Sequence, residues 1–454
     1  MNLPGTVASN PATIAPNPVT RRTWMPRKIL LFAVGTLGDL LPVIALGRRL
    51  RARGHAVTVT THGSYRERIE AAGLHFAEHA AADPRKQMQA VQQQKSTRGL
   101  RGLRERLRLH LAPISPPNRA PLDHLVGLAR SHDVLLSGYG LMRHAAEGVG
   151  IPFAQLALYP IHPTREYPHQ LSRCRRSLGG ALNRLTYWLV GQHFWRRERG
   201  WVNDWRASLG LAPLDWRGRP PTGAGPEIPF FYGFSPTVLP APKDWPTAAR
   251  ITGFWFTEAD PEWRPSDALQ KFLAAGEPPV VLGFGSLVDR QSDQLLTIAR
   301  AAARGCGRRL LVLSGWMPEM AGLSGSDFHQ EEFVPLAWLL PRAALFIHHG
   351  GAGTLAEVLR AGTPSVTIPS SGEQRFWSWR LNAIGAAPPP LPRDQLTTER
   401  LTQALAEALN SPTMSARRPA LAREITAEDG LEQAARRIDE WLVEAVPDRS
   451  AGGG

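Results

Sequence analysis

The stretch that decides the fold is Phe346-Ile347-His348-His349-Gly350-Gly351-Ala352-Gly353-Thr354-Leu355-Ala356-Glu357-Val358-Leu359. An apolar run ending at Ile347 predicts a buried strand, the glycines predict a tight turn, and the residues from Thr354 onward have the apolar spacing of a helix. Such a turn leaves the first amides of the helix free and lets a ligand approach the backbone. Because the helix dipole favours an anion there, we expect a diphosphate to bind at this turn.

The two histidines before Gly-Gly-x-Gly-Thr make the pattern narrower than a glycine turn alone, although a turn whose histidines only satisfy local carbonyls is the plain alternative. The pattern resembles the nucleotide-sugar signature of the GT-B glycosyltransferases, in the group of sterol glucosyltransferases, rhamnolipid rhamnosyltransferases and glycopeptide and macrolide antibiotic glycosyltransferases. The resemblance implies an α/β fold with two Rossmann-like domains facing across a cleft. It also implies that the second domain holds the donor diphosphate through His349, Gly351, Ala352, Gly353 and Thr354.

A second glycine loop follows the first predicted strand of the chain. The buried-strand pattern of residues 28–34 leads into Gly35-Thr36-Leu37-Gly38-Asp39-Leu40-Leu41-Pro42, and a helix and another strand follow. The loop therefore lies at the carboxyl edge of a parallel sheet, where open α/β sheets hold their ligands. A carboxylate there can remove a proton from an acceptor hydroxyl, which makes Asp39 the candidate general base. The alternative is that Asp39 only caps a helix starting near Pro42.

The spacing Gly-x-x-Gly-Asp-x-x-Pro from Gly35 to Pro42 resembles the amino-terminal signature of the same group, which carries a catalytic aspartate. The resemblance favours the role of base for Asp39 and adds Gly38 to the expected donor contacts. Plant and macrolide relatives have histidine at this position, and either residue supports acid–base chemistry.

Three further segments resemble donor-binding parts of these enzymes. The strand pattern from Pro279 ends in Gly285 and Ser286, which resemble a second phosphate contact. In relatives, the loop around Val334 borders the nucleotide base. Glu373 and Gln374 occupy the place of an Asp-Gln pair that hydrogen-bonds the donor sugar, and the glutamate leaves the identity of that sugar open.

The chain of 454 residues is long enough for two domains of ordinary size. The composition shift between Gly218 and Pro246 predicts the connection between them. The expected division is a disordered tail (1–25), an acceptor-binding domain (26–232), a linker (233–248), a nucleotide-sugar-binding domain (249–430), a helix crossing back to the first domain (431–447) and a second tail (448–454).

No apolar run is long enough to span a bilayer, and the first residues lack the order of a secretory signal, so we expect a cytoplasmic protein. The two cysteines, Cys174 and Cys306, form no disulfide framework and fit a reducing compartment. The formal charge of +14 suits nucleic acid, anionic lipid or phosphorylated ligands, but no nucleic-acid motif accompanies it.

Two basic segments carry apolar or aromatic residues, one at 93–111 and one at 159–216. They predict either peripheral contact with the inner face of the membrane or ordinary surface helices, and the aromatic residues of the second also suit an apolar acceptor pocket. The sequence leaves the oligomeric state open.

The resemblance, with its motifs in the expected order along the chain, implies an inverting, metal-independent hexosyltransferase with a nucleotide-sugar co-substrate and no other cofactor. The resemblance favours UDP-glucose as donor, with a dTDP-deoxysugar such as dTDP-rhamnose as the alternative, and a lipophilic acceptor: a sterol, terpenoid, polyketide or lipid natural product. Two functions of other classes remain open, a GT-B sugar-nucleotide epimerase and a non-catalytic activator of a partner transferase.

Overall fold

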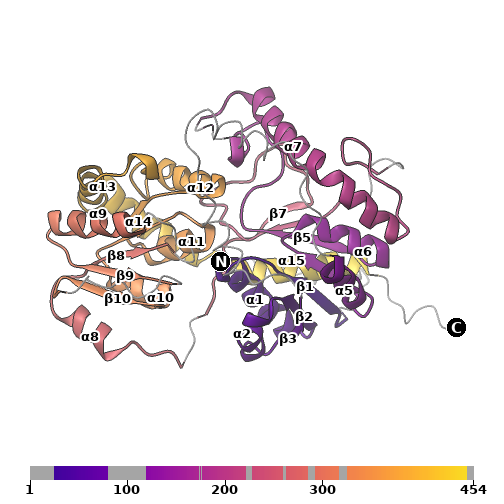
Figure 1. Ribbon diagram of the computed structural model, residues 1–454, viewed down its shortest axis with the longest axis horizontal. Helices are drawn as coiled ribbons and strands as arrows, with labels where there is room; N and C mark the ends of the chain where they lie inside the picture. The colour runs from indigo at the N-terminus through magenta and orange to yellow at the C-terminus, as the bar shows by residue number, and fades with distance from the viewer. Residues whose placement is uncertain are drawn as a thin grey trace, which may run out of the picture.

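The computed structural model describes residues 25–79, 119–172, 174, 176–220, 227–258, 262–284, 292–315 and 325–446. Two α/β lobes lie side by side, one containing β1 to β5 and the other β8 to β10 (Figure 1). Each lobe is built on a parallel sheet, so the predicted α/β class is confirmed.

The first sheet has seven parallel strands in the order β3-β2-β1-β4-β5-β6-β7. Its strands are β1 (Lys28–Phe32), β2 (Ala56–Thr61), β3 (His75–Glu78), β4 (Val134–Ser137), β5 (Phe153–Ala157), β6 (Phe230–Tyr232) and β7 (Ala249–Ile251). Strand β1 lies between β2 and β4, and Ile29, Leu30 and Leu31 are fully buried, as expected of an inner strand covered on both faces.

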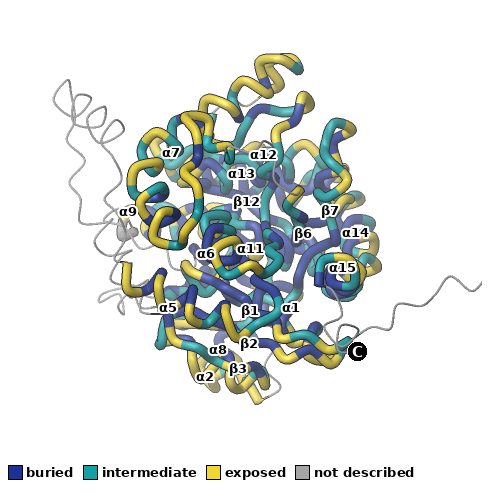
Figure 2. The backbone as a smooth tube through the Cα atoms, turned by 90° about the vertical axis from the view of Figure 1, so that its right-hand side faces the viewer, coloured by how far each residue is buried: buried dark blue, intermediate teal, exposed yellow. Residues whose placement is uncertain are grey.

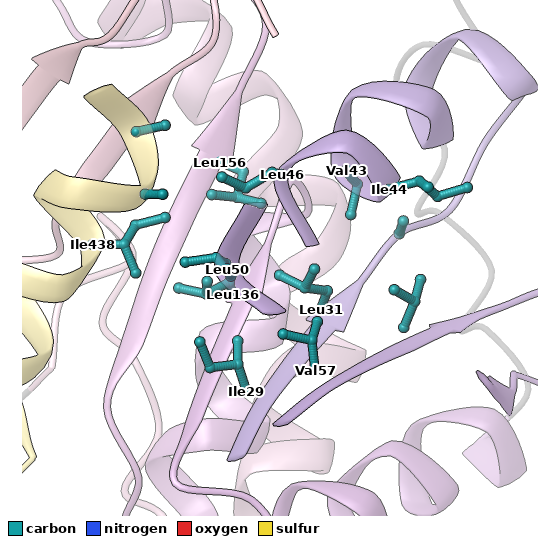
Figure 3. Close-up of a cluster of buried hydrophobic side chains, with 14 of the residues drawn as sticks. Ile29, Leu31, Val43, Ile44, Leu46, Leu50, Val57, Leu136, Leu156 and Ile438 are labelled. Atoms are coloured by element: carbon teal, nitrogen blue, oxygen red, sulfur yellow. The ribbon is translucent and has the colours of Figure 1, made fainter. Parts of the chain in front are cut away.

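Six α-helices and the 3-10 helix nearest the second lobe belong to the described part of this lobe. They are α1 (Leu37–Ala52), α2 (Arg66–Ala71), α5 (Arg119–Ala129), α6 (Arg143–Val149), α7 (Gly180–Ser208), the short 3-10 helix η3 (Gln170–Ser172) and α15 (Gly430–Ala445). Figure 3 shows Leu46 and Leu50 of α1 and Ile438 of α15 in one buried cluster with the strands. The last helix of the chain therefore completes the core of the first lobe.

The helix after β1 begins earlier than the sequence suggested. Instead of starting near Pro42, α1 starts at Leu37, and Pro42 lies inside it. The Asp39 carboxylate accepts the amide of Thr36, the residue before α1, in a capping-box arrangement that fixes this start. Proline at position 42 removes only one amide donor, the one that would bond the carbonyl of Gly38.

The second sheet has five parallel strands in the order β10-β9-β8-β11-β12. Its strands are β8 (Val280–Gly283), β9 (Leu310–Leu313), β10 (Phe328–Glu331), β11 (Leu345–His348) and β12 (Ser365–Thr367). The helices of this lobe are α8 (Asp267–Ala274), α9 (Ser292–Gly305), α10 (Leu336–Leu339), α11 (Ala352–Ala361), α12 (Gly372–Ala383), α13 (Thr398–Asn410) and α14 (Pro412–Thr426).

The segment expected to link the domains, residues 233–248, lies instead between two strands of the first sheet. Strand β6 precedes it, β7 follows it, and the two strands pair in parallel. The chain therefore leaves the first sheet only after Ile251. Strands of three residues are too short for periodicity to reveal, so only the Pro- and Gly-rich loop between them was visible in the sequence.

Within the described residues, no helix is both long and apolar enough to cross a membrane. The two expected tails and the basic segment 93–111 lie outside the described residues, apart from Met25.

Candidate active site

Asp39 lies in the first turn of α1, directly after the carboxyl end of β1. Its Oδ2 accepts a hydrogen bond from the amide of Thr36 at 2.8 Å and another from Thr36 Oγ1 at 3.0 Å. A cap is therefore present, but Asp39 contributes to it as the third residue of α1 and not as the residue before a helix near Pro42. It occupies one carboxylate oxygen, and among the described residues no donor bonds Oδ1.

Gly35 allows the Asp39 carboxylate to fold back over the loop. Its φ of +119° belongs to the region that favours glycine, and a Cβ there would lie 2.5 Å from Asp39 Oδ2. Asp39 as a residue is exposed, but the protein around its carboxyl group keeps much of the water away. This desolvation raises the pKa of Asp39 above 3.8, and it outweighs the hydrogen bonds from Thr36, which lower the pKa. A raised pKa makes Asp39 a better proton acceptor near neutral pH.

The predicted diphosphate turn joins β11 to α11. Gly350 has a φ of +86°, and a Cβ there would lie 2.5 Å from Ser378 Oγ and 3.0 Å from the carbonyl oxygen of Gln374. The amide of Gly350 donates to Nδ1 of the buried His348 at 3.2 Å, and the His348 ring stacks on Phe346. His348 thus holds the shape of the turn rather than facing a ligand.

His349 lies against Gly351, where a side chain would collide with His349 Nε2. Burial lowers the pKa of His349 to about 4, so its imidazole is neutral at pH 7 and carries one N–H donor. Its Nδ1 is buried and has no hydrogen-bond partner among the described residues.

The amino end of α11 carries a carboxylate in this structure. The amide of Ala352, the first residue of α11, donates to the carboxylate of Glu373, near the start of α12. The amide group expected to meet a phosphate thus already meets a carboxyl oxygen, a contact that the helix dipole favours when the carboxyl is ionised.

Glu373 and Asp39 come from different lobes, and the charge of Asp39 reaches Glu373. Burial raises the pKa of Glu373 to about 7, and the charge of Asp39 adds to the increase. Glu373 is therefore close to half-protonated at neutral pH.

Tyr159, which the sequence reasoning did not select, belongs to the same neighbourhood. Burial raises the pKa of its phenol, and the charges of Glu373 and Asp39 raise it further. The available signal was its position two residues after β5, at the carboxyl edge of the sheet that also presents Asp39.

Gln374 is used differently from the expectation. Its Oε1 accepts the amides of Ser370 at 2.9 Å and Ser371 at 3.1 Å, and Ser371 Oγ accepts the amide of Gln374, which forms a capping box for α12. Only the Nε2 group of Gln374 is left for a sugar.

The other residues predicted to contact the donor differ in their exposure. Gly353 and Thr354 lie in the first turn of α11, exposed and half-buried respectively, and Gly38 is exposed in the first turn of α1. The side chain of Val334 is buried in the core, so only its backbone is available to a base. Gly285 and Ser286 lie outside the described residues.

Two family models match the chain, one near its beginning and one near its end. The glycosyltransferase family 28 N-terminal domain matches residues 29–109. The C-terminal domain of erythromycin biosynthesis protein CIII-like proteins matches residues 325–440. The two regions contain Asp39 and the β11–α11 turn respectively.

Curated relatives extend the similarity over most of the chain. An O-mycaminosyltylonolide 6-deoxyallosyltransferase of Streptomyces fradiae is 35% identical over 420 residues, which cover 91% of this chain and 97% of the relative. A sterol 3-beta-glucosyltransferase of Arabidopsis thaliana is 31% identical over 92% of this chain and 66% of its own length.

Solved structures share the fold at low sequence identity. A spinosyn forosaminyltransferase superposes with a TM-score of 0.64 at 19% identity, covering 92% of this chain and all of the other. A calicheamicin glycosyltransferase gives a TM-score of 0.63 at 16% identity, covering 93% of this chain and all of the other. Both superpositions include the two lobes and not one alone.

Proposed function

Because this chain belongs to the GT-B glycosyltransferases, in the group that includes sterol and macrolide glycosyltransferases, we propose that it transfers a hexose from a nucleotide diphosphate sugar to a hydroxyl of a lipophilic acceptor, with inversion at the anomeric carbon. The observation that carries this proposal is that α1, which bears Asp39 in the first lobe, contacts α11 of the second lobe, and that the charge of Asp39 reaches Glu373 at the start of α12. A proton acceptor and an anion-binding helix end are thereby brought to one place.

In the proposed reaction, Asp39 Oδ1 takes the proton of the acceptor hydroxyl as the oxygen attacks the anomeric carbon. The bond between that carbon and the diphosphate oxygen breaks on the opposite face, and the electron pair leaves with the nucleoside diphosphate. The hydrogen bonds from Thr36 to Oδ2 hold the carboxylate in place during this step.

The charge that develops on the diphosphate is stabilised by the amides at the start of α11 and by the N–H of neutral His349. No step of this mechanism uses a metal or a further cofactor. Since Glu373 accepts the Ala352 amide without a donor, binding of the donor has to move that carboxylate toward the sugar or protonate it.

UDP-glucose is the first donor to test, in keeping with the sterol glucosyltransferase relatives. A dTDP-deoxysugar is the second candidate, because the relative that aligns over nearly its whole length is by name a deoxyallosyltransferase. The corresponding acceptors are a sterol and a glycosylated macrolide. Both relatives are named as transferases, which favours transfer over epimerisation or a non-catalytic activating role.

The test combines each donor with each acceptor and the purified protein, and follows product by mass spectrometry. The proposal predicts one glycosylated acceptor, with its anomeric configuration inverted from the donor by NMR. Retention of configuration would contradict the role of Asp39 as a base for direct displacement. Epimerised donor without transfer would replace the proposed reaction.

A further inference from the structure

The long helix α7 exposes an apolar face along its first half. Leu182, Leu185, Trp188 and Leu189 are each between 43% and 54% exposed. Their spacing puts them on one side of the helix, opposite the buried Asn183. Figure 2 shows long exposed stretches along α7. These four residues are here named the α7 apolar face.

The exposure is concentrated rather than scattered. Of the eleven large hydrophobic side chains that are exposed among the described residues, seven lie between Leu171 and Phe194. Single exposed apolar side chains are ordinary on a soluble protein, whereas a contiguous group marks a surface that binds something apolar.

The surroundings of the α7 apolar face are strongly cationic. Residues 165–199 contain eight arginines, two glutamates and neither aspartate nor lysine. Arg196 follows Leu189 by two helical turns on the same side and is exposed, as is Arg199, while Gln192 between Leu189 and Arg196 is buried. Of the two glutamates, Glu166 already accepts the amide of Lys243 at 3.1 Å.

We infer that the α7 apolar face and its arginines dock on an anionic phospholipid surface. Leucine and tryptophan side chains insert at the boundary between headgroups and acyl chains, while arginines contact lipid phosphates. A second copy of the chain fits less well, because a two-fold contact through this face would bring the same arginines together on a protein of formal charge +14.

The 3-10 helix next to the α7 apolar face links α7 to the candidate active site. Helix η3, which precedes α7, packs on the start of α12: a Cβ on Gly372 would lie 2.6 Å from Leu171 Cδ2 and 2.9 Å from the carbonyl oxygen of Gln170. Gly372 directly precedes Glu373. If the proposed function holds, docking would bring the site to the surface in which a lipophilic acceptor dissolves.

The full chain is floated with vesicles of phosphatidylcholine, with and without phosphatidylglycerol, at low and high salt. Wild-type protein is expected to bind only the anionic vesicles and to be released by salt. The double variant Leu185→Glu/Leu189→Glu should reduce bound protein roughly tenfold, because it removes apolar insertion and adds repulsion. Arg196→Gln/Arg199→Gln should weaken mainly the salt-sensitive part.

Phe333→Glu is the matched control, since Phe333 is 50% exposed in the other lobe, and it should bind vesicles like the wild type. Absence of wild-type binding, binding to neutral vesicles alone, or an equal loss in the control would overturn the inference. A dimer that is seen by sedimentation velocity and that dissociates in the leucine variant would also overturn it, because a second copy would then cover the face. A large fall in the melting temperature of the leucine variant would overturn it as well, because the chain itself would then cover the face. Transfer to a detergent-dispersed acceptor is measured in parallel, so failure of docking and failure of the proposed function are distinguished.

Discussion

Asp39 takes part in a helix cap and is also the proposed general base, two roles that the sequence analysis treated as alternatives. Its Oδ2 caps α1 through Thr36, and its Oδ1 has no partner among the described residues. Capping orients the carboxylate at the sheet edge, so the structural role supports the proposed chemical one. A residue that only capped the helix would not require its pKa to be raised.

The variant Asp39→Asn tests the division of these roles. Asparagine retains an oxygen for the Thr36 hydrogen bonds but cannot accept the acceptor proton, so kcat should fall about 10²–10⁴-fold while nucleotide affinity stays nearly unchanged. Steady-state kinetics and calorimetry measure both. Asp123→Asn, an exposed change on α5, is the control. Full turnover by Asp39→Asn would remove this residue from the mechanism.

Glu373 makes the stability of the protein depend on pH. Its pKa of about 7 in the folded protein lies above the ordinary 4.5, so the folded state retains a proton that the unfolded state has lost between these values. Stability should therefore fall as pH rises from about 4.5 to about 7, by up to ~3 kcal/mol from this group.

The variant Glu373→Gln should flatten that dependence and leave the protein more stable than the wild type at pH 8. Urea unfolding at pH 5 and pH 8 provides the comparison. Glu67→Gln, an exposed substitution on α2, should follow the wild-type curve. Parallel curves for Glu373→Gln and the wild type would show that Glu373 is ionised throughout this range.

At the scale of elements, the β11–α11 turn depends on one glycine conformation. Gly350→Ala would force a side chain into a φ of +86° and against Ser378 and Gln374, and should cost at least about 2 kcal/mol of unfolding free energy. Gly353→Ala is the matched change, because a Cβ there meets nothing within 4 Å and alanine favours a helix by about 1 kcal/mol.

Denaturant unfolding of the two variants should move their midpoints in opposite directions. An equal shift for both would mean that the turn tolerates a side chain at position 350, and that its geometry does not require glycine.

The sequence was informative where a local pattern determines the structure. Strands β1 and β11 are apolar runs ending at glycine loops, and both are confirmed. The start of α1 was misplaced because the Thr36–Asp39 capping box outweighed the signal of Pro42. Strands β6 and β7 were missed because three residues show no periodicity.

The candidate site was predictable only one lobe at a time. Asp39 and Glu373 are separated by more than 300 residues, and no local sequence pattern predicts that the charge of Asp39 reaches Glu373. The hydrogen bond from Ala352 to Glu373 and the proximity of Tyr159 to both carboxylates depend on how the lobes pack, which a single sequence does not encode in its spacing.

At the scale of the whole molecule, the two lobes are joined twice, because the last helix of the chain packs on the first lobe. Helix α15 packs its Ala434, Ile438 and Leu442 into the core of the first lobe. Asp439 on the same helix accepts hydrogen bonds from Arg53 at 2.5 Å and His55 at 2.7 Å. The second lobe is therefore held between β7 and α15, both attached to the first, which keeps the two halves of the site together.

The most direct test of the central claim, that this junction binds a nucleotide sugar, is a thermal-shift and calorimetric panel of UDP, dTDP, UDP-glucose, UDP-galactose, UDP-N-acetylglucosamine and dTDP-rhamnose. The wild type should be stabilised by one nucleotide class, and His349→Ala should lose much of that shift while the exposed His75→Ala keeps it. No shift from any nucleotide, or an equal shift in His349→Ala, would contradict a diphosphate site at the start of α11.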